Sequence, residues 1–283
     1  MMNIFETQKV YDNFYLISER ISPTMVCTMG LVIGDKTAAL VDTGFGVTGS
    51  LRKHVETITD RPVICLITHC DPDHAGAAAL FDTIYMSDLD DELQPWSLKV
   101  DKRISDVTLA SHRNQELVGY MKTHMVLSEG IQHQNLHEGE EFDLGGVKLE
   151  AFPLPGHSKG SFCFLNREEG YALTGDSVAA VSYPMLLALR CTSLAVYAKA
   201  LRHFYDATGE KMGLYSGHRM DPFPQGLVKD LLRGCDEIFS GDTENDRSAR
   251  FPFDKVVADD LKPMEHLISD SNASIRYNAK RIY

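Results

Sequence analysis

The segment His69-Cys70-Asp71-Pro72-Asp73-His74 constrains this chain more than any other feature. It follows the apolar, partly β-branched run 63–67, which predicts a buried strand that ends at the segment. Imidazole and carboxylate side chains together suit zinc, iron or manganese. The segment taken alone is also compatible with an ordinary solvated turn, because Asp-Pro often begins one. The potential ligands are His69, Asp71, Asp73 and His74.

Three later segments favour the metal interpretation. Each places one His or Asp beside glycine at the end of a strand-like run, where backbone can approach a bound group closely. The residues are His157 in Gly-His-Ser-Lys-Gly-Ser, Asp176 in Thr-Gly-Asp and His218 in Ser-Gly-His. Any one of these segments alone would more often be a plain turn.

With these four motifs in order, the chain resembles the metallo-β-lactamase superfamily. The pattern of that family is His-x-His-x-Asp-His, then Gly-His-(Thr/Ser)-x-Gly-Ser, then Thr-Gly-Asp and a late His. The turn Val41-Asp42-Thr43-Gly44 matches the early Asp-Thr-Gly of the family as well. The resemblance covers roughly residues 8–220. It implies an α/β fold, namely a four-layer αββα sandwich, with the metals at one edge.

The resemblance also implies a ligand scheme. Site one would hold its metal through His69, residue 71 and His157. Site two would use Asp73, His74 and His218, and Asp176 would bridge the two ions. Asp42 would support the site from behind the ligands. An equally open interpretation makes Asp42 a turn residue that orders the glycines after it.

Asp71 departs from the family pattern, which has a second His at this position. A carboxylate adds negative charge to site one and shifts its preference from zinc toward iron or manganese. Flavodiiron proteins also carry a carboxylate here. However, too little chain follows His218 for a flavodoxin-like domain. Cys70 could compete as a soft ligand, but a packing role is favoured, since free cysteine is commonly a small buried hydrophobe.

The leading functional hypothesis is a dinuclear hydrolase for a small ester, thioester, lactone or amide. Two divalent ions about 4 Å apart, zinc first with iron or manganese as alternatives, would lower the pKa of a shared water. The metal-bound hydroxide would attack the substrate, and Asp73 would orient it as the catalytic residue. The alternatives are a non-haem iron oxidoreductase related to flavodiiron proteins and a metal-binding protein without catalysis.

Length, charge and cysteine content restrict the binding partners and the cellular location that we expect for this chain. The chain has 283 residues, consistent with a single domain over 1–283, and a net charge of −12, which disfavours nucleic acid and anionic membranes. No CxxC pair, no secretory signal and no long apolar run is present, so we expect reduced, buried cysteines in a cytoplasmic protein. A small-molecule substrate and a possible homodimer complete these expectations.

The pattern of apolar residues predicts elements around the motifs. We expect strands over 10–17, 25–33, 38–41, 147–152 and 162–165, a short strand before Asp176, and helices over 48–58, 73–81, 112–127, 194–205 and 225–239. The helix at 73–81 would place its positive N-terminus near the ligands. Gly145-Gly146 predicts a hairpin. The tail after 241 could finish the sheet or mediate dimer contacts.

A helical insertion at about 86–130 is expected to cover the site. A helical layer with its own core is an equally open interpretation. Residues that could line the pocket are Trp96, Tyr120, Met121 and Met125, and residues beside the motifs that could contact substrate are Ser158, Lys159, Tyr183 and Tyr215.

Overall fold

A mixed sheet forms the first half of the fold. The computed structural model describes residues 2, 4–128, 130–188, 190–209, 211–224, 226–249 and 261–283. The first four strands of this sheet run antiparallel, and the remaining ones continue in parallel. In spatial order the strands are β1 (Phe5–Lys9), β2 (Phe14–Ser22), β3 (Met25–Ile33), β4 (Ala38–Val41), β5 (Val63–Leu66), β6 (Ile84–Met86) and β7 (Gln134–Asn135).

A second sheet packs face to face on the first. Its spatial order is β13-β11-β10-β9-β8, and Gly145-Gly146 forms the predicted hairpin between β8 and β9. Its strands are β8 (Glu141–Asp143), β9 (Lys148–Pro153), β10 (Phe162–Asn166), β11 (Tyr171–Gly175) and β13 (Gly213–Ser216).

Strand alternation explains why both sheets are buried on both faces. In β4, Ala39 and Val41 face the second sheet, whereas Leu40 belongs to the core under the helices. In β10, Phe164 meets the first sheet and Cys163 faces the opposite way. Because successive side chains of a strand point to opposite faces, apolar runs of this kind fit between two layers.

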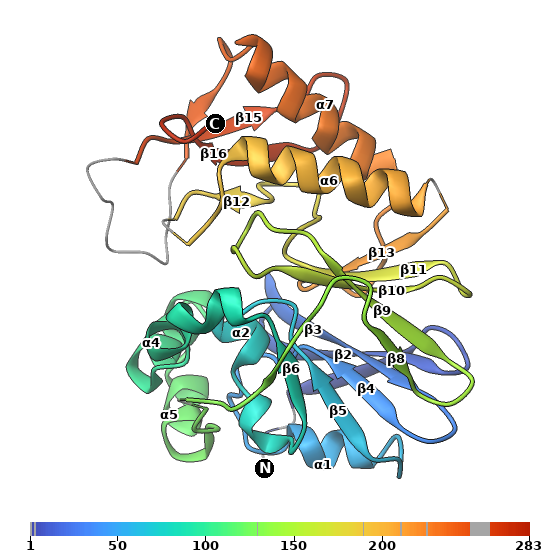
Figure 1. The fold of residues 1–283 in the computed structure, drawn as a ribbon. Helices are drawn as coiled ribbons and strands as arrows, with labels where there is room; N and C mark the ends of the chain where they lie inside the picture. Colours follow the sequence, from blue (N-terminus) through green and yellow to red (C-terminus); the bar gives the residue numbers. More distant parts are fainter. Residues whose placement is uncertain are drawn as a thin grey trace.

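Helices cover the two outer faces (Figure 1). The apolar sides of α1 (Leu51–Glu56), α4 (Val100–Ala110) and α5 (Gln115–His124) share a core with the first sheet. The helices α6 (Leu194–Thr208) and α7 (Gly226–Ser240) share another core with the second sheet. The arrangement is helix–sheet–sheet–helix, which confirms the predicted αββα sandwich.

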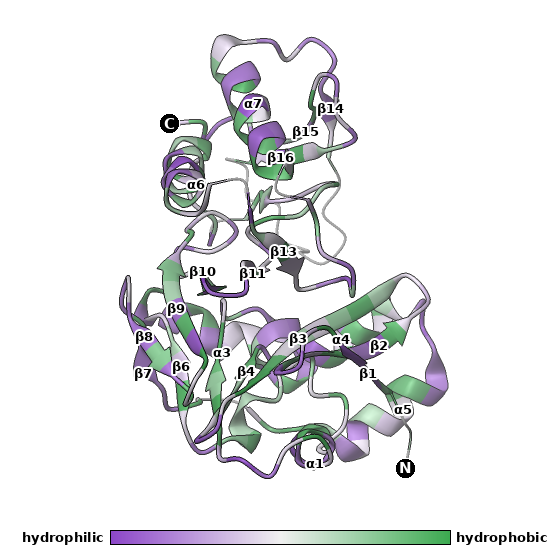
Figure 2. Cartoon of the chain, turned by 90° about the vertical axis from the view of Figure 1, so that its right-hand side faces the viewer, coloured by the Kyte–Doolittle hydropathy of each residue, from purple (hydrophilic) through white to green (hydrophobic). Residues whose placement is uncertain are grey.

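The C-terminal tail adds a further sheet outside this sandwich. Its spatial order is β12 (Met185–Leu186), β16 (Ser274–Asn278), β15 (Pro263–Leu267) and β14 (Arg247–Ser248). It packs on α7, which carries both hydrophilic and hydrophobic residues along its length (Figure 2). The tail therefore builds its own sheet rather than finishing one of the two central sheets. Residues 250–260 of the tail lie outside the described residues.

Two element predictions are wrong in their bounds. The expected strand 10–17 is interrupted by a turn over 10–13, where Val10 N and Tyr11 N donate to Phe14 O at 2.9 and 3.1 Å. The expected helix 73–81 is only α2 (Pro72–Ala75) followed by a 3-10 helix, Ala78–Leu80. The helix does not continue beyond Gly76, because Gly76 N donates to Gly44 O at 2.9 Å and Ala77 N to Thr43 Oγ1 at 3.1 Å. A four-residue helix has little dipole, so the expected helix-terminus field at the ligands is absent.

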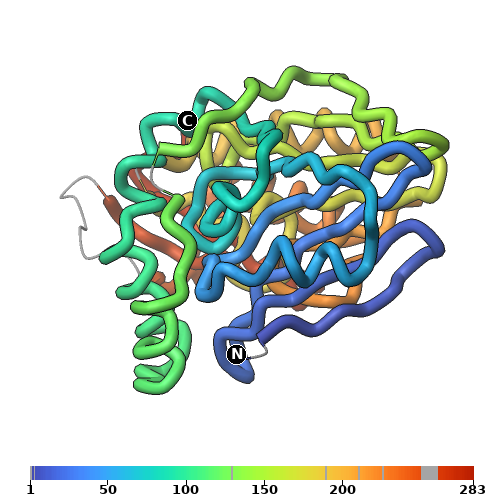
Figure 3. Tube along the Cα trace, turned by 90° about the horizontal axis from the view of Figure 1, so that it is seen from below, coloured from blue at the N-terminus to red at the C-terminus, as the bar shows by residue number. Residues whose placement is uncertain are grey.

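Short helices fill the stretch that was predicted as an insertion. They are the 3-10 helix Asp88–Leu93 (η2), α3 (Gln94–Ser97), α4 and α5. Seen from below, these helices lie at one side of the molecule (Figure 3). The predicted helix 225–239 begins at Gly226 in α7, and residue 225 lies outside the described residues.

Candidate metal centre

Site one forms where β5 and β9 end. The loop after β5 carries His69 and Asp71, and the loop after β9 carries His157. Asp71 Oδ2 lies 3.1 Å from His157 Nε2 and 3.7 Å from His69 Nε2. One ligand atom from each of the three residues lies within 4.8 Å of the other two. All three side chains are buried, so the group is enclosed by protein.

Site two lies beside it and uses the ends of β11 and β13. Asp176 Oδ1 lies 3.4 Å from His74 Nε2 and 3.2 Å from His218 Nε2. Asp73 Oδ2 lies 3.8 Å from His74 Nε2 and 3.5 Å from His218 Nε2. Asp176 also reaches site one, because its Oδ2 is 3.7 Å from His157 Nε2. The structure thus brings all seven predicted ligand residues together.

Gly217 allows the loop that carries His218 to lie close to His74 and Asp176. A Cβ on Gly217 would lie 2.4 Å from His74 Cε1 and 3.1 Å from Asp176 Oδ1. The first of these distances is too short for any real Cβ, so it leaves no room for a side chain at this position. Glycine before His218 therefore lets the chain pass directly over two other candidate ligands.

Several polar atoms of these candidate ligands have no hydrogen-bond partner. His69 Nε2, His74 Nε2, Asp71 Oδ1 and Asp176 Oδ1 are buried without a hydrogen-bond partner. Buried polar atoms nearly always have a partner, so each such atom needs an explanation. Imidazole nitrogens and carboxylate oxygens that share one enclosed space fit divalent cations. The donor set of this structure is therefore suited to the metal ions that the sequence predicts.

Asp42 orients the ligands from behind. Its Oδ2 lies 2.7 Å from His74 Nδ1, and its Oδ1 accepts a hydrogen bond from Thr68 N at 2.8 Å. An Nδ1–H that donates to Asp42 leaves Nε2 of His74 as the nitrogen that faces site two. Asp42 has a φ of 64°, so it is also a turn residue. The two interpretations of Asp42 are compatible.

Asp90 accepts hydrogen bonds from both loops of site one and so connects them. The sequence analysis did not identify this residue. Its Oδ2 accepts from Cys70 N at 3.0 Å and from Ser158 Oγ at 2.7 Å, and its Oδ1 accepts from Gly160 N at 2.8 Å. Burial raises the pKa of Asp90, whereas these hydrogen bonds favour its charged form. No local pattern marks this residue, because its partners come from two distant loops.

The charges of the site are coupled. Burial alone would lower the pKa of His74, but Asp42, Asp176 and Asp73 hold it well above its usual value. Burial alone would raise the pKa of Asp176, but His218 and His74 hold it well below its usual value. Histidine must be neutral to bind a metal, so metal binding here would release protons.

Arg190 binds the carboxylate that replaces the expected histidine. Its Nη2 donates to Asp71 Oδ2 at 2.7 Å. Burial opposes the charge of Asp71, but Arg190 and then His157 hold its pKa far below the usual range. The guanidinium offsets the extra negative charge that Asp71 brings into site one. Sequence analysis missed Arg190, which lies outside every motif.

A cavity opens onto the candidate metal centre. Trp96, from the helical insertion, lines it as predicted, and so does Tyr183. Met121 is wholly buried in the helix-side core, and Met125 packs against that core, so their predicted pocket role is wrong. The residues lining the cavity are Met25, Phe45, Asp71, Pro72, Asp73, Trp96, Lys102, Asp106, Asp176, Tyr183, Met185, Arg190 and His218.

The other predicted pocket residues also lie elsewhere. Tyr120 stacks on His124 with ring centroids 3.9 Å apart and does not line the cavity. Ser158 is buried in the Asp90 contacts, Lys159 is exposed, and Tyr215 packs between the sheets.

The six cysteines are free and buried, as expected. Cys70 packs in the helix-side core, consistent with the packing role. Cys27, on β3, was not predicted to lie near metals, yet it forms a candidate ligand group with Asp73 and His218. Burial raises the pKa of the Cys27 thiol well above its usual value, and Asp73 adds to this effect.

Comparison with known proteins agrees with the motifs and the fold. A family model described as the metallo-beta-lactamase superfamily matches residues 23–86. The chain is therefore similar to this superfamily in sequence over that stretch. A metallo-beta-lactamase family protein from Thermus thermophilus has a similar fold, with a TM-score of 0.61, 20% identity and 82% of each chain covered. A metallo-beta-lactamase from Pontibacter korlensis has a TM-score of 0.57 at 16% identity and covers 81% of this chain and 97% of its own.

Relatives with named activities match over a shorter part of the chain. The acyl-coenzyme A thioesterase MBLAC2 of Gallus gallus is 25% identical over 159 residues, which is 52% of this chain and 56% of the relative. MBLAC2 of Homo sapiens is 26% identical over 164 residues, or 52% and 57%. The matched region therefore spans little more than half of these relatives. Among the described residues, no helix is both long and apolar enough to cross a membrane.

Proposed function

We propose that this chain is a dinuclear metal-dependent hydrolase that acts on a small ester, thioester, lactone or amide. The observation that carries the proposal is the convergence of seven buried or half-buried His and Asp side chains, several with unpartnered atoms, at one edge of the sandwich. The similarity to hydrolases named as acyl-coenzyme A thioesterases supports it and makes thioesters the first class to test.

The candidate ligands would bind two ions, and Asp73 would also act on the attacking water. His69, Asp71 and His157 would hold one ion, and the ligands of site two would hold the other, with zinc as the first expectation. Bound divalent metals act as Lewis acids that polarise a carbonyl and lower the pKa of water. Asp73 lines the cavity, and its Oδ2 lies 3.5 Å from His218 Nε2, so it can orient the attacking water and hold its proton.

The apolar part of the cavity wall would suit the acyl group of a thioester. Met25, Phe45 and Met185 give it an apolar wall for an acyl chain. Lys102 lies 4.4 Å from the centroid of the Trp96 ring, a cationic and aromatic pair at the cavity wall. Four aspartates line the cavity, but two divalent ions would offset their charge and permit an anionic substrate.

The test is metal analysis followed by a substrate panel. Protein purified without added metal or chelator should contain two zinc or manganese ions per chain and should hydrolyse at least one ester, thioester or lactone. His157→Ala should lose one ion and lower kcat/KM by at least about 10-fold, because loss of a ligand costs at least as much as loss of its supporting partner. The matched control is His137→Ala, which changes an exposed histidine.

Other results would overturn the proposal. Two iron ions with consumption of oxygen or nitric oxide and no hydrolysis would favour the non-haem iron oxidoreductase. Metal binding without turnover on any substrate in the panel would favour a metal-binding protein without catalysis.

A further inference from the structure

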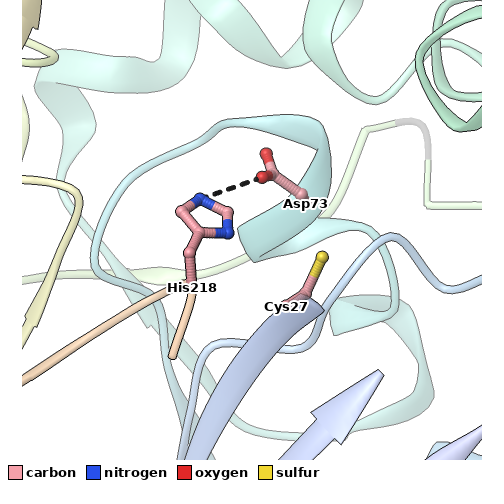
Figure 4. Close-up of side chains that lie close together, drawn as sticks. All are labelled: Cys27, Asp73 and His218. Carbon is pink, nitrogen blue, oxygen red and sulfur yellow. Dashed lines mark ion pairs between the residues drawn. The ribbon is translucent and has the colours of Figure 1, made fainter. Parts of the chain in front are cut away.

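Cys27 lies among the ligands of site two although no motif includes it. It sits near the start of β3, and Figure 4 shows its sulfur pointing toward the space between Asp73 and His218. Cys27 Sγ, a carboxylate oxygen of Asp73 and a ring nitrogen of His218 lie within 4.8 Å of one another. Such separations allow a single ion to contact all three atoms.

Two contacts fix β3 against the loop that carries His218. Thr28 N donates to Gly217 O at 2.7 Å, and His218 Nδ1 donates to Val26 O at 2.9 Å. The residues on both sides of Cys27 therefore bind the loop directly. The second contact also leaves Nε2 of His218 as the nitrogen that faces Asp73 and Asp176. The position of Cys27 beside His218 is thus set by backbone.

Unpartnered buried atoms point to a ligand at the same place. His74 Nε2 has no hydrogen-bond partner and lies 3.8 Å from Asp73 Oδ2, an atom that also faces His218. Asp176 Oδ1, likewise unpartnered, lies 3.2 Å from His218 Nε2. The side chains of His74 and Asp176 are at least nine-tenths buried. A cation bound between Asp73 and His218 would lie beside these atoms. Cys27 Sγ belongs to the same candidate group as Asp73 and His218.

We propose that Cys27 is a thiolate ligand of the metal in site two. This inference rests on the metal centre proposed above and adds a ligand from β3 to it. On binding, the Cys27 S–H bond breaks, the sulfur keeps the electron pair and donates it to the metal, and the proton passes to solvent. The ion is the electron-pair acceptor, so no oxidant or reductant is needed.

The two sites would then differ in chemical character. Site one has the hard carboxylate of Asp71 where a histidine was expected, whereas site two gains a soft sulfur. Thiolate ligands select zinc over manganese and magnesium, whereas carboxylates, which also suit manganese and magnesium, discriminate less. The chain is therefore built for unequal metal preferences, with zinc held more selectively in site two.

Cobalt substitution tests the ligand directly. Metal-free protein is titrated with Co²⁺, and bound cobalt is counted by equilibrium dialysis. Wild-type protein should develop an intense near-ultraviolet thiolate-to-cobalt charge-transfer band. Cys27→Ser and Cys27→Ala should lose this band, keep the weaker visible bands of cobalt bound to nitrogen and oxygen, and bind the ion of site two at least about 10-fold more weakly.

Cys70→Ala is the matched control, because Cys70 lies inside the first metal motif but packs in the core. It should keep the charge-transfer band. Far-ultraviolet circular dichroism confirms that each variant is folded. A band that persists in both Cys27 variants, or is absent from wild-type protein carrying two cobalt ions, would overturn the proposal. Wild-type protein that binds no cobalt would instead overturn the metal centre itself.

Discussion

Asp42 illustrates at the scale of one residue how a side chain behind the ligands can organise them. It contacts His74 Nδ1 and the backbone and hydroxyl of Thr68, which immediately precedes His69. One carboxylate therefore orients a candidate ligand of site two and anchors the loop of site one. Supporting contacts of this kind fix the ring orientation of a metal-binding histidine.

Asp42→Asn should weaken metal binding about 10- to 100-fold while the fold persists. Asparagine tolerates the positive φ of 64° at this position, so the substitution removes charge and keeps the turn. The measurement is competitive titration of metal-free protein with a chromophoric chelator. Asp60→Asn, at an exposed position, should leave the affinity unchanged. Equal affinities for the two variants would show that Asp42 serves only the turn.

The loop 43–47 shows how elements from opposite sides hold one segment. Glu19 on β2 accepts hydrogen bonds from Phe45 N at 2.6 Å and Val47 N at 2.9 Å. Arg103 on α4 donates to Phe45 O at 2.6 Å from the helical side. Phe45 lines the cavity, so these two buried charged residues position part of the pocket wall.

Glu19 should make stability fall as the pH rises. Burial raises its pKa from 4.5 to about 7, while hydrogen bonds from Val47 and Phe45 act against this shift. Between these pH values the folded chain keeps a proton that the unfolded chain has lost, so unfolding becomes easier. The free energy of unfolding should lose on the order of 3 kcal/mol across this range relative to Glu19→Gln, which does not titrate.

Urea denaturation at several pH values from the unfolded pKa of Glu19 to just above its folded pKa measures this difference. A constant difference in the free energy of unfolding between wild type and Glu19→Gln does not matter. The prediction concerns how this difference changes with pH. Glu116→Gln, at an exposed position on α5, should run parallel to wild type. Parallel curves for Glu19→Gln would contradict the prediction.

At the scale of the whole molecule, the C-terminal sheet is an addition outside the αββα sandwich. His266 of β15 lies between two carboxylates, with Asp246 Oδ1 at 2.7 Å and Glu237 Oε2, from α7, at 2.8 Å. Gly234 of α7 meets the same sheet, because a Cβ there would lie 2.7 Å from Ile268 Cγ1. The C-terminal sheet therefore packs against α7 through polar and apolar contacts.

Two Gly→Ala substitutions distinguish the effect of packing against the C-terminal sheet from the effect of helix propensity on stability. Gly119→Ala in α5 adds a methyl group with no atom within 4 Å and should stabilise the protein by about 0.5–1 kcal/mol. Gly234→Ala should instead destabilise it by about 1–3 kcal/mol, because the methyl group displaces Ile268 and Ile275. Thermal and urea unfolding measure both effects. Stabilisation by Gly234→Ala would mean that the C-terminal sheet is loosely held against α7.

The four ligand motifs and the strands before them could be predicted from the sequence, because each is formed by residues that are neighbours along the chain. A β-branched run followed by His and Asp beside glycine or proline marks a strand end, whatever the rest of the chain does. Their order along the chain indicated the superfamily, and strands 25–33 and 38–41 were predicted with their observed bounds. The predicted bounds of α2 failed because Gly76 N and Ala77 N donate to Gly44 O and Thr43 Oγ1, which lie outside the segment.

By itself, the sequence determined the layered fold and the set of His and Asp residues that gather at its edge. Only the tertiary structure decided what surrounds them: Arg190 on Asp71, Asp90 between two loops, and Cys27 beside His218. The physical reason is separation along the chain. Arg190 and Asp71 are 119 residues apart, and an ion pair over such a distance leaves no periodic trace in either segment. Folding alone brings these groups into contact.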